Sequence, residues 1–298
     1  MAYPIIPAAY GLKPVSLAGG RVYSGSTRLI PIASNYGYNL FDGDVVTASG
    51  GSLVVTTLGA ASSPVAGTIG VFVGSQYVNS MSQTVRAQFY AANTITNTLY
   101  GPNSLQGYVV DDPYAVFQAA VLTQSTSVSN TPGATIGYVN PSFIGSNMYL
   151  VTNGSNGGSA SGNTTTGDSA MGLTGGAITS GTQGNTRITS SAPFRVVNVV
   201  PDTAITVTAV GSTSGSSTTL TLTAANTAIS PGMQLIIPGV TGALASNFLT
   251  VTNVSSTTVT LSASITVASG TALSFIGYPE VQVQWNFGYH GYLNATAA

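Results

Sequence analysis

The all-β fold class that the sequence predicts, a β-sandwich or barrel, follows from three observations. Strong helix formers such as Glu and Lys are almost absent from the 298 residues. Gly, Ser, Thr and Asn interrupt the chain every few residues, as turn residues do. Several short stretches between these interruptions alternate apolar and polar side chains, which is the period of a half-buried strand. Many short strands with regular turn signals are typical of sandwiches and barrels.

The first clear strands lie between residues 52 and 90. "SLVVTT" (52–57) and "GTIGVFV" (67–73) are short apolar runs bounded by Gly and Ser. "TVRAQFY" (84–90) alternates strictly, so that Val85, Ala87 and Phe89 share one face. We expect all three stretches to belong to the main β domain.

The N-terminal segment, residues 1–30, predicts an extended arm. "PIIPAAYGLKP" is spaced by prolines, which favours extended backbone over helix. The first 41 residues hold Lys13, Arg21 and Arg28 and no acid. Such an arm could lie across a partner protein or across its own domain, and the sequence leaves both possibilities open.

Residues 153–186 form a low-complexity stretch that begins "NGSNGGSASGNTTTGDSAMG". This composition predicts a long exposed loop. The sequence does not separate a disordered linker from an ordered surface loop.

Residues 203–275 predict a small β module inserted into the main domain, because no charged residue occurs between Asp202 and Glu280. "STTLTLTA" and "TTVTLSASITV" alternate, and "VTNVSSTTVTL" predicts a hairpin that turns at Ser255 and Ser256. The flanks "APFRVVNVV" and "YPEVQVQWNF" would pair with each other if the module were removed. Hairpin tips tolerate such insertions, which leaves a main domain of 31–202 plus 276–298.

The inserted module should contain six strands, and one of its faces should be apolar. The apolar face is formed by Leu220, Leu222, Val259, Leu261 and Ile265. The expected strands are 204–210, 218–224, 232–237, 248–254, 257–262 and 271–276.

The charge of the chain restricts its function. Only 4% of residues are charged, against roughly 25% in a typical soluble domain, and the net charge is −1. This excludes the basic field of a nucleic-acid-binding protein. It also gives little repulsion between copies, which suits a chain packed against partners. The chain has no cysteine and no apolar run near 18 residues, and its N-terminus lacks the charged region of a signal peptide. We expect no cofactor, nucleic acid or membrane as a partner.

The acidic residues and the single histidine do not form a convincing active site. Asp111 and Asp112 are adjacent, so in a strand their side chains would point to opposite faces. Asp112 precedes Pro113, where an aspartate is expected to bind backbone N–H groups at a turn. "FDGDVV" (41–46) is predicted to be a turn and not a calcium loop, because the further acids of such a loop are missing. His290 is expected to be a packing or surface residue. The sequence therefore predicts that the protein is not an enzyme.

The number and placement of the tyrosines predict that the protein binds other proteins. The chain has 15 Tyr, gathered towards the N-terminal arm and the C-terminus. Tyr combines a broad contact area with a polar tip and is favoured at protein interfaces. A platform that stacks on carbohydrate is the alternative.

Four parts of the chain together resemble structural proteins of tailed bacteriophages that decorate or cement the capsid. They are "YGLKPVSLAGGRVYSGSTRLIPIASNYGYNLFDGDVV" (10–46), "GTIGVFVGSQYVNS" (67–80), "YVVDDPYAVFQAAV" (108–121) and the closing "PFRVVNVVPD … YPEVQVQWNFGYH". The resemblance covers the main domain in order. The function of this family does not depend on catalytic residues, so it implies none here.

The resemblance implies a cement protein on the outer surface of the virion. The partner would be the major capsid protein, and several copies, as dimers or trimers, would add avidity. The contact residues that we expect are Tyr3, Tyr10, Lys13, Arg21 and Arg28. A receptor-binding fibre module that recognises host glycans is the alternative, and a polysaccharide-degrading enzyme is a third, which would need two of the seven acids to converge.

Overall fold

The computed structural model describes residues 9–33, 36–56, 68–94, 104–123, 135–136, 141–151, 162–174, 192–203, 206–236, 249–286 and 289–290. In these residues the fold is all-β, as predicted. The helical elements that are described in full are two single 3-10 turns, Pro141–Phe143 and Pro201–Thr203. The helix content of this part of the chain therefore includes nothing long and apolar enough to cross a membrane.

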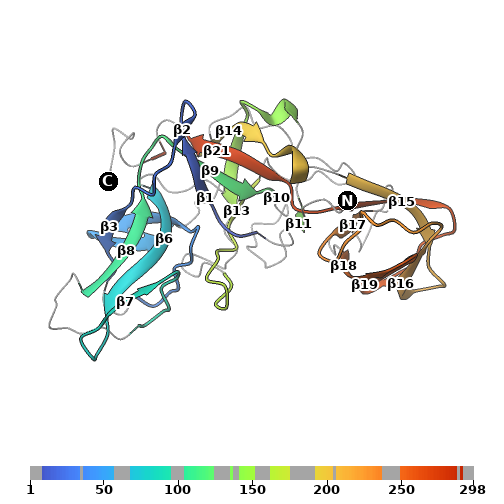
Figure 1. Cartoon of the computed structure of the whole chain (residues 1–298), viewed down its shortest axis with the longest axis horizontal. Helices are drawn as coiled ribbons and strands as arrows, with labels where there is room; N and C mark the ends of the chain where they lie inside the picture. Colours follow the sequence, from blue (N-terminus) through green and yellow to red (C-terminus); the bar gives the residue numbers. More distant parts are fainter. Residues whose placement is uncertain are drawn as a thin grey trace.

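The main domain is built from two antiparallel sheets (Figure 1). The first has the order β13 (Gly172–Thr174), β12 (Asn147–Val151), β14 (Phe194–Val199), β21 (Glu280–Trp285), β9 (Ala115–Ala120), β1 (Lys13–Leu17), β2 (Arg21–Val22). The second has the order β3 (Arg28–Pro31), β8 (Leu105–Val110), β6 (Thr68–Val78), β4 (Val45–Ser49), β5 (Ser52–Val55), with β7 (Thr84–Ala87) also paired to β6. A separate pair is formed by β10 (Leu122–Thr123) and β11 (Thr135–Ile136).

The second sheet curves until its two edge strands meet. The contact between the edges is a parallel bridge from Ile32, just after β3, to Leu53 in β5. Side chains from both sheets fill one continuous core, which includes Phe72, Phe117 and Trp285. At 11 residues β6 is longer than the predicted 67–73. Gly70 permits its close crossing with β8, since a Cβ there would lie 2.2 Å from the carbonyl oxygen of Val110.

The uncharged region forms a closed barrel of six strands. Their order around the barrel is β15 (Thr206–Ser212), β16 (Ser217–Leu222), β19 (Thr258–Ile265), β18 (Leu249–Ser255), β17 (Gln234–Ile236), β20 (Thr271–Ile276). The five side chains of the predicted apolar face all lie in the barrel's own core. The predicted hairpin is present, but it turns at 256–257, one residue later than expected, with Ser256 at φ 53°.

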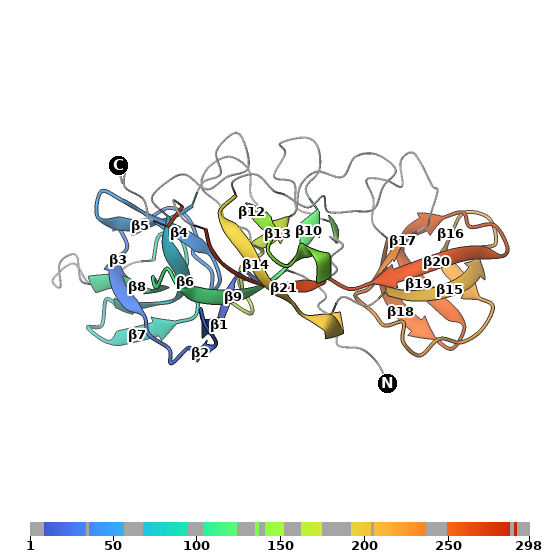
Figure 2. The ribbon, with the colours of Figure 1, turned by 90° about the horizontal axis from the view of Figure 1, so that it is seen from above.

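The barrel is joined to the main domain through two neighbouring strands. β14 precedes it and β21 follows it, and these strands pair antiparallel, with Val196 opposite Val283 and one irregularity between Val196 and Asn198. The ends of the barrel also meet, since Thr206 pairs with Ile276. Figures 1 and 2 show the barrel at one end of an elongated molecule, with β3, β7 and β8 at the other end.

The described part of the predicted arm belongs instead to the main domain. β1 pairs with β9, and β3 pairs with β8, so residues 13–31 contribute strands to both sheets. Of the two possibilities that the sequence left open, the described residues show the segment on its own domain, where it forms strands because proline-spaced backbone is extended in a strand as well as in a free arm. Here Pro14 lies beside an irregularity in the β1–β9 register, and Pro31 ends β3. Residues 1–8 lie outside the described residues.

The predicted exposed loop is only partly correct where it is described: residues 163–166 are exposed, but the residues after them form a strand and enter the core. Within 162–174, β13 pairs with β12, and Met171 and Leu173 are in the main core. The rest of 153–186 lies outside the described residues.

Candidate interaction surface

The five predicted contact residues have different surroundings. Tyr3 lies outside the described residues. Tyr10, Lys13 and Arg28 bind acidic side chains of the same chain. Arg21 is exposed, and its Nε donates to the carbonyl oxygen of Ala18 at 3.4 Å. Three of these described residues are cations, and only Arg21 among them is not bound by a carboxylate of the described residues. Its charge is therefore available to another molecule.

Lys13 holds together three segments that are far apart in the sequence, in a group that we call the Lys13 cluster (Lys13, Asp42, Gln88 and Asp168). Its Nζ lies 2.8 Å from Asp42 Oδ2 and 2.8 Å from Asp168 Oδ1. Gln88 Nε2 donates to Asp42 Oδ2 at 3.3 Å. Burial alone would raise the pKa of Asp168, but Lys13 and the Thr166 hydroxyl hold that pKa below its ordinary value. The ammonium group occupies the space between the carboxylates.

Two glycines allow the turn at 41–44 to reach the start of β1. Gly11 has φ +80° and Gly43 has φ +98°, and a Cβ on Gly43 would lie 2.8 Å from Gly11 Cα. Leu12 N donates to the Gly43 carbonyl at 3.0 Å. This close contact of two backbones is what brings Asp42 beside Lys13.

Asp44 is buried just below the Lys13 cluster. Its Oδ2 accepts the backbone N–H of Phe41 at 2.7 Å, while its Oδ1 has no hydrogen-bond partner. Burial raises the pKa of Asp44 to about 7, although contacts with Ser169 and the Phe41 amide lower it in part. A carboxyl group that binds its proton this firmly avoids leaving a bare anion in the core.

Asp111 and Asp112 have separate structural roles. Asp112 Oδ1 accepts the backbone N–H of Tyr114 at 2.8 Å, and its carbonyl accepts the N–H of Ala115, as expected for a turn. Asp111 Oδ2 lies 2.8 Å from Arg28 Nε. In the described part of the chain, no three acidic or histidine side chains are placed to hold a metal ion.

The single glutamate is buried where the barrel joins the main domain, in a group that we call the Glu280 clamp (Tyr10, Gln118, Thr203 and Glu280). The Glu280 carboxylate accepts the Tyr10 hydroxyl, and it accepts Gln118 Nε2 at 3.0 Å. Its backbone N–H donates to Thr203 Oγ1 at 3.0 Å. Burial raises the pKa of Tyr10, and the bond to Glu280 raises that pKa further. Tyr10 thus joins the segment before β1 to the first residue of β21 and does not reach outward.

His290 is a packing residue. It is fully buried, and its ring lies 5.4 Å from the Trp285 ring in an edge-to-face contact. Burial lowers its pKa. A buried neutral imidazole in an aromatic cluster agrees with the packing role expected from the sequence.

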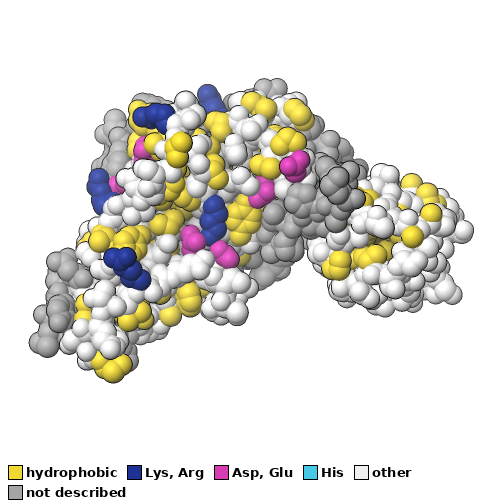
Figure 3. Space-filling model, in the orientation of Figure 1, with side chains coloured by type: hydrophobic (Ala, Val, Ile, Leu, Met, Phe, Trp, Pro, Cys, Tyr) yellow, Lys and Arg dark blue, Asp and Glu magenta, His cyan; other side chains and the backbone are white. Residues whose placement is uncertain are grey.

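The exposed charge that remains on the main domain is mostly basic, and Asp202 is its exposed acid. All seven acids and five of the six bases are described, Arg187 being outside. Arg21, Arg86 and Arg195 are exposed, and no carboxylate among the described residues forms an ion pair with them. Figure 3 shows charged side chains over the main domain and none on the visible face of the barrel.

Arg86 belongs to a prearranged group on the outer face of the second sheet, the Tyr108 platform (Leu29, Gln76, Arg86 and Tyr108). Leu29 pairs with Tyr108, and Gln76 pairs with Arg86, across adjacent strands. The guanidinium carbon lies 5.8 Å from the Tyr108 ring centroid. Gln76 Oε1 accepts Arg86 Nε at 3.2 Å and the Tyr108 hydroxyl at 2.7 Å. Such a cation–π contact contributes about 0.5–1 kcal/mol at an exposed site.

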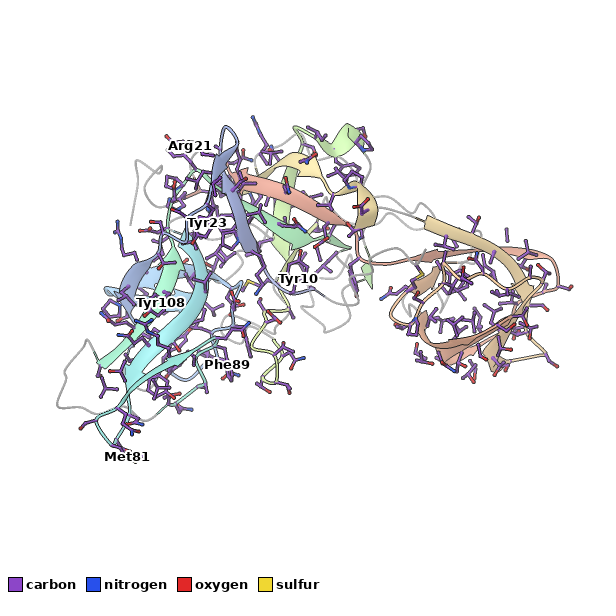
Figure 4. The ribbon with its side chains drawn as sticks, in the orientation of Figure 1. Tyr10, Arg21, Tyr23, Met81, Phe89 and Tyr108 are labelled. Atoms are coloured by element: carbon purple, nitrogen blue, oxygen red, sulfur yellow. The ribbon has the colours of Figure 1, made fainter. Side chains whose placement is uncertain are left out.

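Large apolar side chains are exposed on the same domain. Val22 is 83% exposed in β2, Met81 is 73% exposed at the β6–β7 turn, and Leu29 is 40% exposed on the platform. Figure 4 places Tyr108 and Met81 at the end of the molecule away from the barrel. Tyr, Met and Arg are the residue types enriched in protein interfaces.

The barrel presents a different surface, made of hydroxyl and amide groups. Ser212, Thr221, Thr258 and Ser255 form one row across four strands. Thr219, Thr260 and Asn253 form the next row. Both rows point outward, because the alternating residues Leu220 and Val259 are in the core.

The sequence did not indicate the Tyr108 platform, because its four residues come from four strands. The strict alternation of 84–90 places Arg86 on the polar face, which is the one available signal. Comparison of the chain with models of protein families, with curated proteins and with solved structures gives no match. Its function is therefore inferred from its own residues.

Proposed function

We propose that this chain is a cement protein that decorates the outer surface of a bacteriophage capsid. It binds the major capsid protein through the main domain and stabilises the contacts between neighbouring coat subunits. The resemblance of 10–46, 67–80 and 108–121 to phage decoration proteins supports this proposal. The low charge of the chain supports it as well, since a cement protein spends its life packed against other proteins.

One observation carries the proposal furthest: the two ends of the molecule have different surfaces. Arg86, Tyr108, Leu29 and Met81 gather at one end, and the uncharged barrel lies at the other (Figures 1 and 4). The first end has the composition of a docking surface. The barrel is then held away from the shell and covered with groups that hydrogen-bond to water.

Stabilisation follows from mass action. A protein that binds the assembled lattice, and not the free coat subunits, shifts the equilibrium towards the lattice. At a concentration 100 times its dissociation constant this contributes about 2.7 kcal/mol for each site. Dimers or trimers of the chain would bind several coat subunits at once and gain avidity.

The direct test compares particles that have the protein with particles that lack it. We expect particles without the protein to release DNA at a lower temperature, and added purified protein to restore the release temperature. Equal heat stability of the two particles would contradict a cement role. Deletion of residues 1–30 is unsuitable as a test of attachment, because it removes β1, β2 and part of β3.

A receptor-binding role for the barrel is the second candidate, and the hydroxyl rows favour it. Hydroxyl groups in a regular array can exchange hydrogen bonds with the hydroxyls of a glycan. The test uses the full chain with Thr219→Lys and Thr221→Lys, which fill both rows with long side chains. Loss of binding to host cells, with attachment to particles retained, would support this role.

A further inference from the structure

We infer that the Tyr108 platform is the anchor of the docking surface, and that Arg86 receives a carboxylate from an acidic patch of the partner protein. This inference rests on the proposed function, because the partner is the capsid shell. It goes further by naming the anchor residue and the chemistry that it recognises.

The guanidinium of Arg86 is already held in place before any partner arrives. Tyr108 supports one face of it, and Gln76 accepts its Nε. The two terminal Nη groups are the edge that matches the two oxygens of a carboxylate. A side chain that is fixed in advance loses less conformational freedom on binding. Gln76 is itself fixed by the Tyr108 hydroxyl, so the three side chains act as one unit.

Charge complementarity selects the partner. Four of the acids are engaged or buried within the main domain: Asp42 and Asp168 bind Lys13, Asp111 pairs with Arg28, and Asp44 is buried. Asp202 is exposed, but it lies in the 3-10 turn Pro201–Thr203 between β14 and the barrel, not on the strands of the platform. The ion pairs of the described residues do not include Arg86. A carboxylate on the partner would supply the missing counter-charge.

A protein surface fits these residues better than nucleic acid does. Nucleic acid affinity comes from rows of cations that contact many phosphates. Here the arginines are scattered, and Lys13 is neutralised by its own cluster. Leu29 lies beside Tyr108 and is 40% exposed, so an apolar contact adjoins the charge. Arg and Tyr surrounded by apolar contacts that exclude water are the usual composition of a protein hot spot.

The experiment measures binding of purified protein to particles that lack it, for wild type, Arg86→Gln, Arg86→Lys and Tyr108→Ala. Arg195→Gln is the matched control, because it removes the same charge from an exposed position in β14. We expect Arg86→Gln and Tyr108→Ala to weaken binding by about 30-fold or more, the loss typical of a hot-spot side chain. Arg86→Lys should be intermediate, and Arg195→Gln should bind like wild type. Unchanged Trp285 fluorescence will establish that each variant is folded.

Two further arms identify the partner group. Particles whose carboxylates have been converted to neutral amides should lose wild-type binding. Wild-type binding should also weaken between low and high salt more steeply than binding of Arg86→Gln, since salt screens exposed charge pairs.

The outcomes separate the two proposals. If wild type binds the particles and Arg86→Gln binds equally well, the anchor is wrong and the cement role stands. If wild type does not bind at all, both are wrong. Two results would overturn a carboxylate partner. One is binding to the particles that persists after their carboxylates are converted to amides. The other is an Arg86-dependent binding that is seen with DNA extracted from the particles and not with the particles themselves.

Discussion

The main domain and the barrel are both stable β-folds with few charges, but they differ in how their strand edges and their charges are arranged. The main domain has open strand edges, and it contains every charged residue that the structure describes. The ion pairs of Lys13 join β1 to Asp42 and Asp168, which lie outside the named strands, whereas Arg28–Asp111 reinforces the paired strands β3 and β8. The barrel closes on itself, so it has no edge that needs a charge to prevent pairing with other chains. A β-surface of hydroxyl groups can remain uncharged when its backbone groups are all paired within one closed sheet.

The largest expected effect is a loss of main-domain stability when the contact between the Gly11 and Gly43 backbones is disrupted, with no change in the barrel. Gly43→Val places a side chain against the backbone of Gly11 and Leu12, at a positive φ. We expect a loss of unfolding free energy on the order of 3 kcal/mol or more. Trp285, the single tryptophan, reports the main domain by fluorescence, and hydrogen exchange of barrel peptides should remain unchanged.

The control for this variant is Gly25→Val. Gly25 has a similar φ of +81°, but a Cβ there meets nothing within 4 Å. It should lose only the cost of the backbone conformation, about 1–2 kcal/mol. Equal losses in the two variants would mean that the contact with Gly11 does not matter.

The converse change tests whether the barrel is independent. Leu220→Ala empties a fully buried position of the barrel core and should destabilise the barrel by about 2–5 kcal/mol. Hydrogen exchange in 206–236 should accelerate, while the Trp285 unfolding midpoint stays fixed. Thr219→Ala, next to it on the exposed face, is the control. A shift of the Trp285 midpoint in Leu220→Ala would show that the two regions unfold together.

Asp44 gives the main domain a pH dependence that the uncharged barrel lacks. Its pKa is about 7 when folded and near 3.8 otherwise, so the folded state binds more protons between these values. Stability therefore falls as pH rises from about 4 to 7. The lowered pKa of His290 makes stability rise with pH below the ordinary pKa of histidine. The Asp44 contribution is therefore measured as the difference in unfolding free energy between wild type and a variant that lacks the Asp44 carboxyl group.

We expect the unfolding free energy of wild type, relative to Asp44→Asn, to decrease between pH 5 and pH 8. Urea unfolding followed through Trp285 measures it, and His290 cancels because it is present in both proteins. A difference that does not change with pH would contradict a raised Asp44 pKa.

The smallest expected effect is on stability, and it comes from a turn of the main domain that can be compared with a turn of the barrel. The main domain turns at Asp112 with an acid bound to Tyr114 N, whereas the barrel hairpin turns at Ser256 without any charge. Asp112→Ala should cost about 1 kcal/mol, the value of a lost cap. Asp112→Asn keeps the acceptor and should cost less, as urea midpoints will show.

The same contrast explains what could be predicted from the sequence. In the barrel, β16 and the first half of β19 alternate, and every strand pairs within about 70 residues. Local periodicity and turn signals therefore located all six strands. β1 instead pairs with β9, roughly a hundred residues away, and no local pattern distinguishes such a strand from a free extended segment. Gly74 likewise suggested the end of the strand predicted at 67–73, whereas β6 continues through it to Val78.

The candidate site was less predictable than the fold. Lys13 and Arg28 were recognised as cations, but their carboxylate partners are brought to them by tertiary structure alone. Asp112 could be assigned to a turn because its partner is two residues away. Arg86 and Gln76 lie ten residues apart on paired strands, and only the register places both beside Tyr108.

The junction between β14 and β21 has a consequence for how such proteins can change. Thr206 and Ile276 are paired neighbours, so the chain that forms the barrel leaves the main domain and returns to it at one point. A gene segment encoding another domain with adjacent termini could replace the barrel without altering the register of β14 and β21. The same junction is a site where a foreign domain could be displayed on a particle surface.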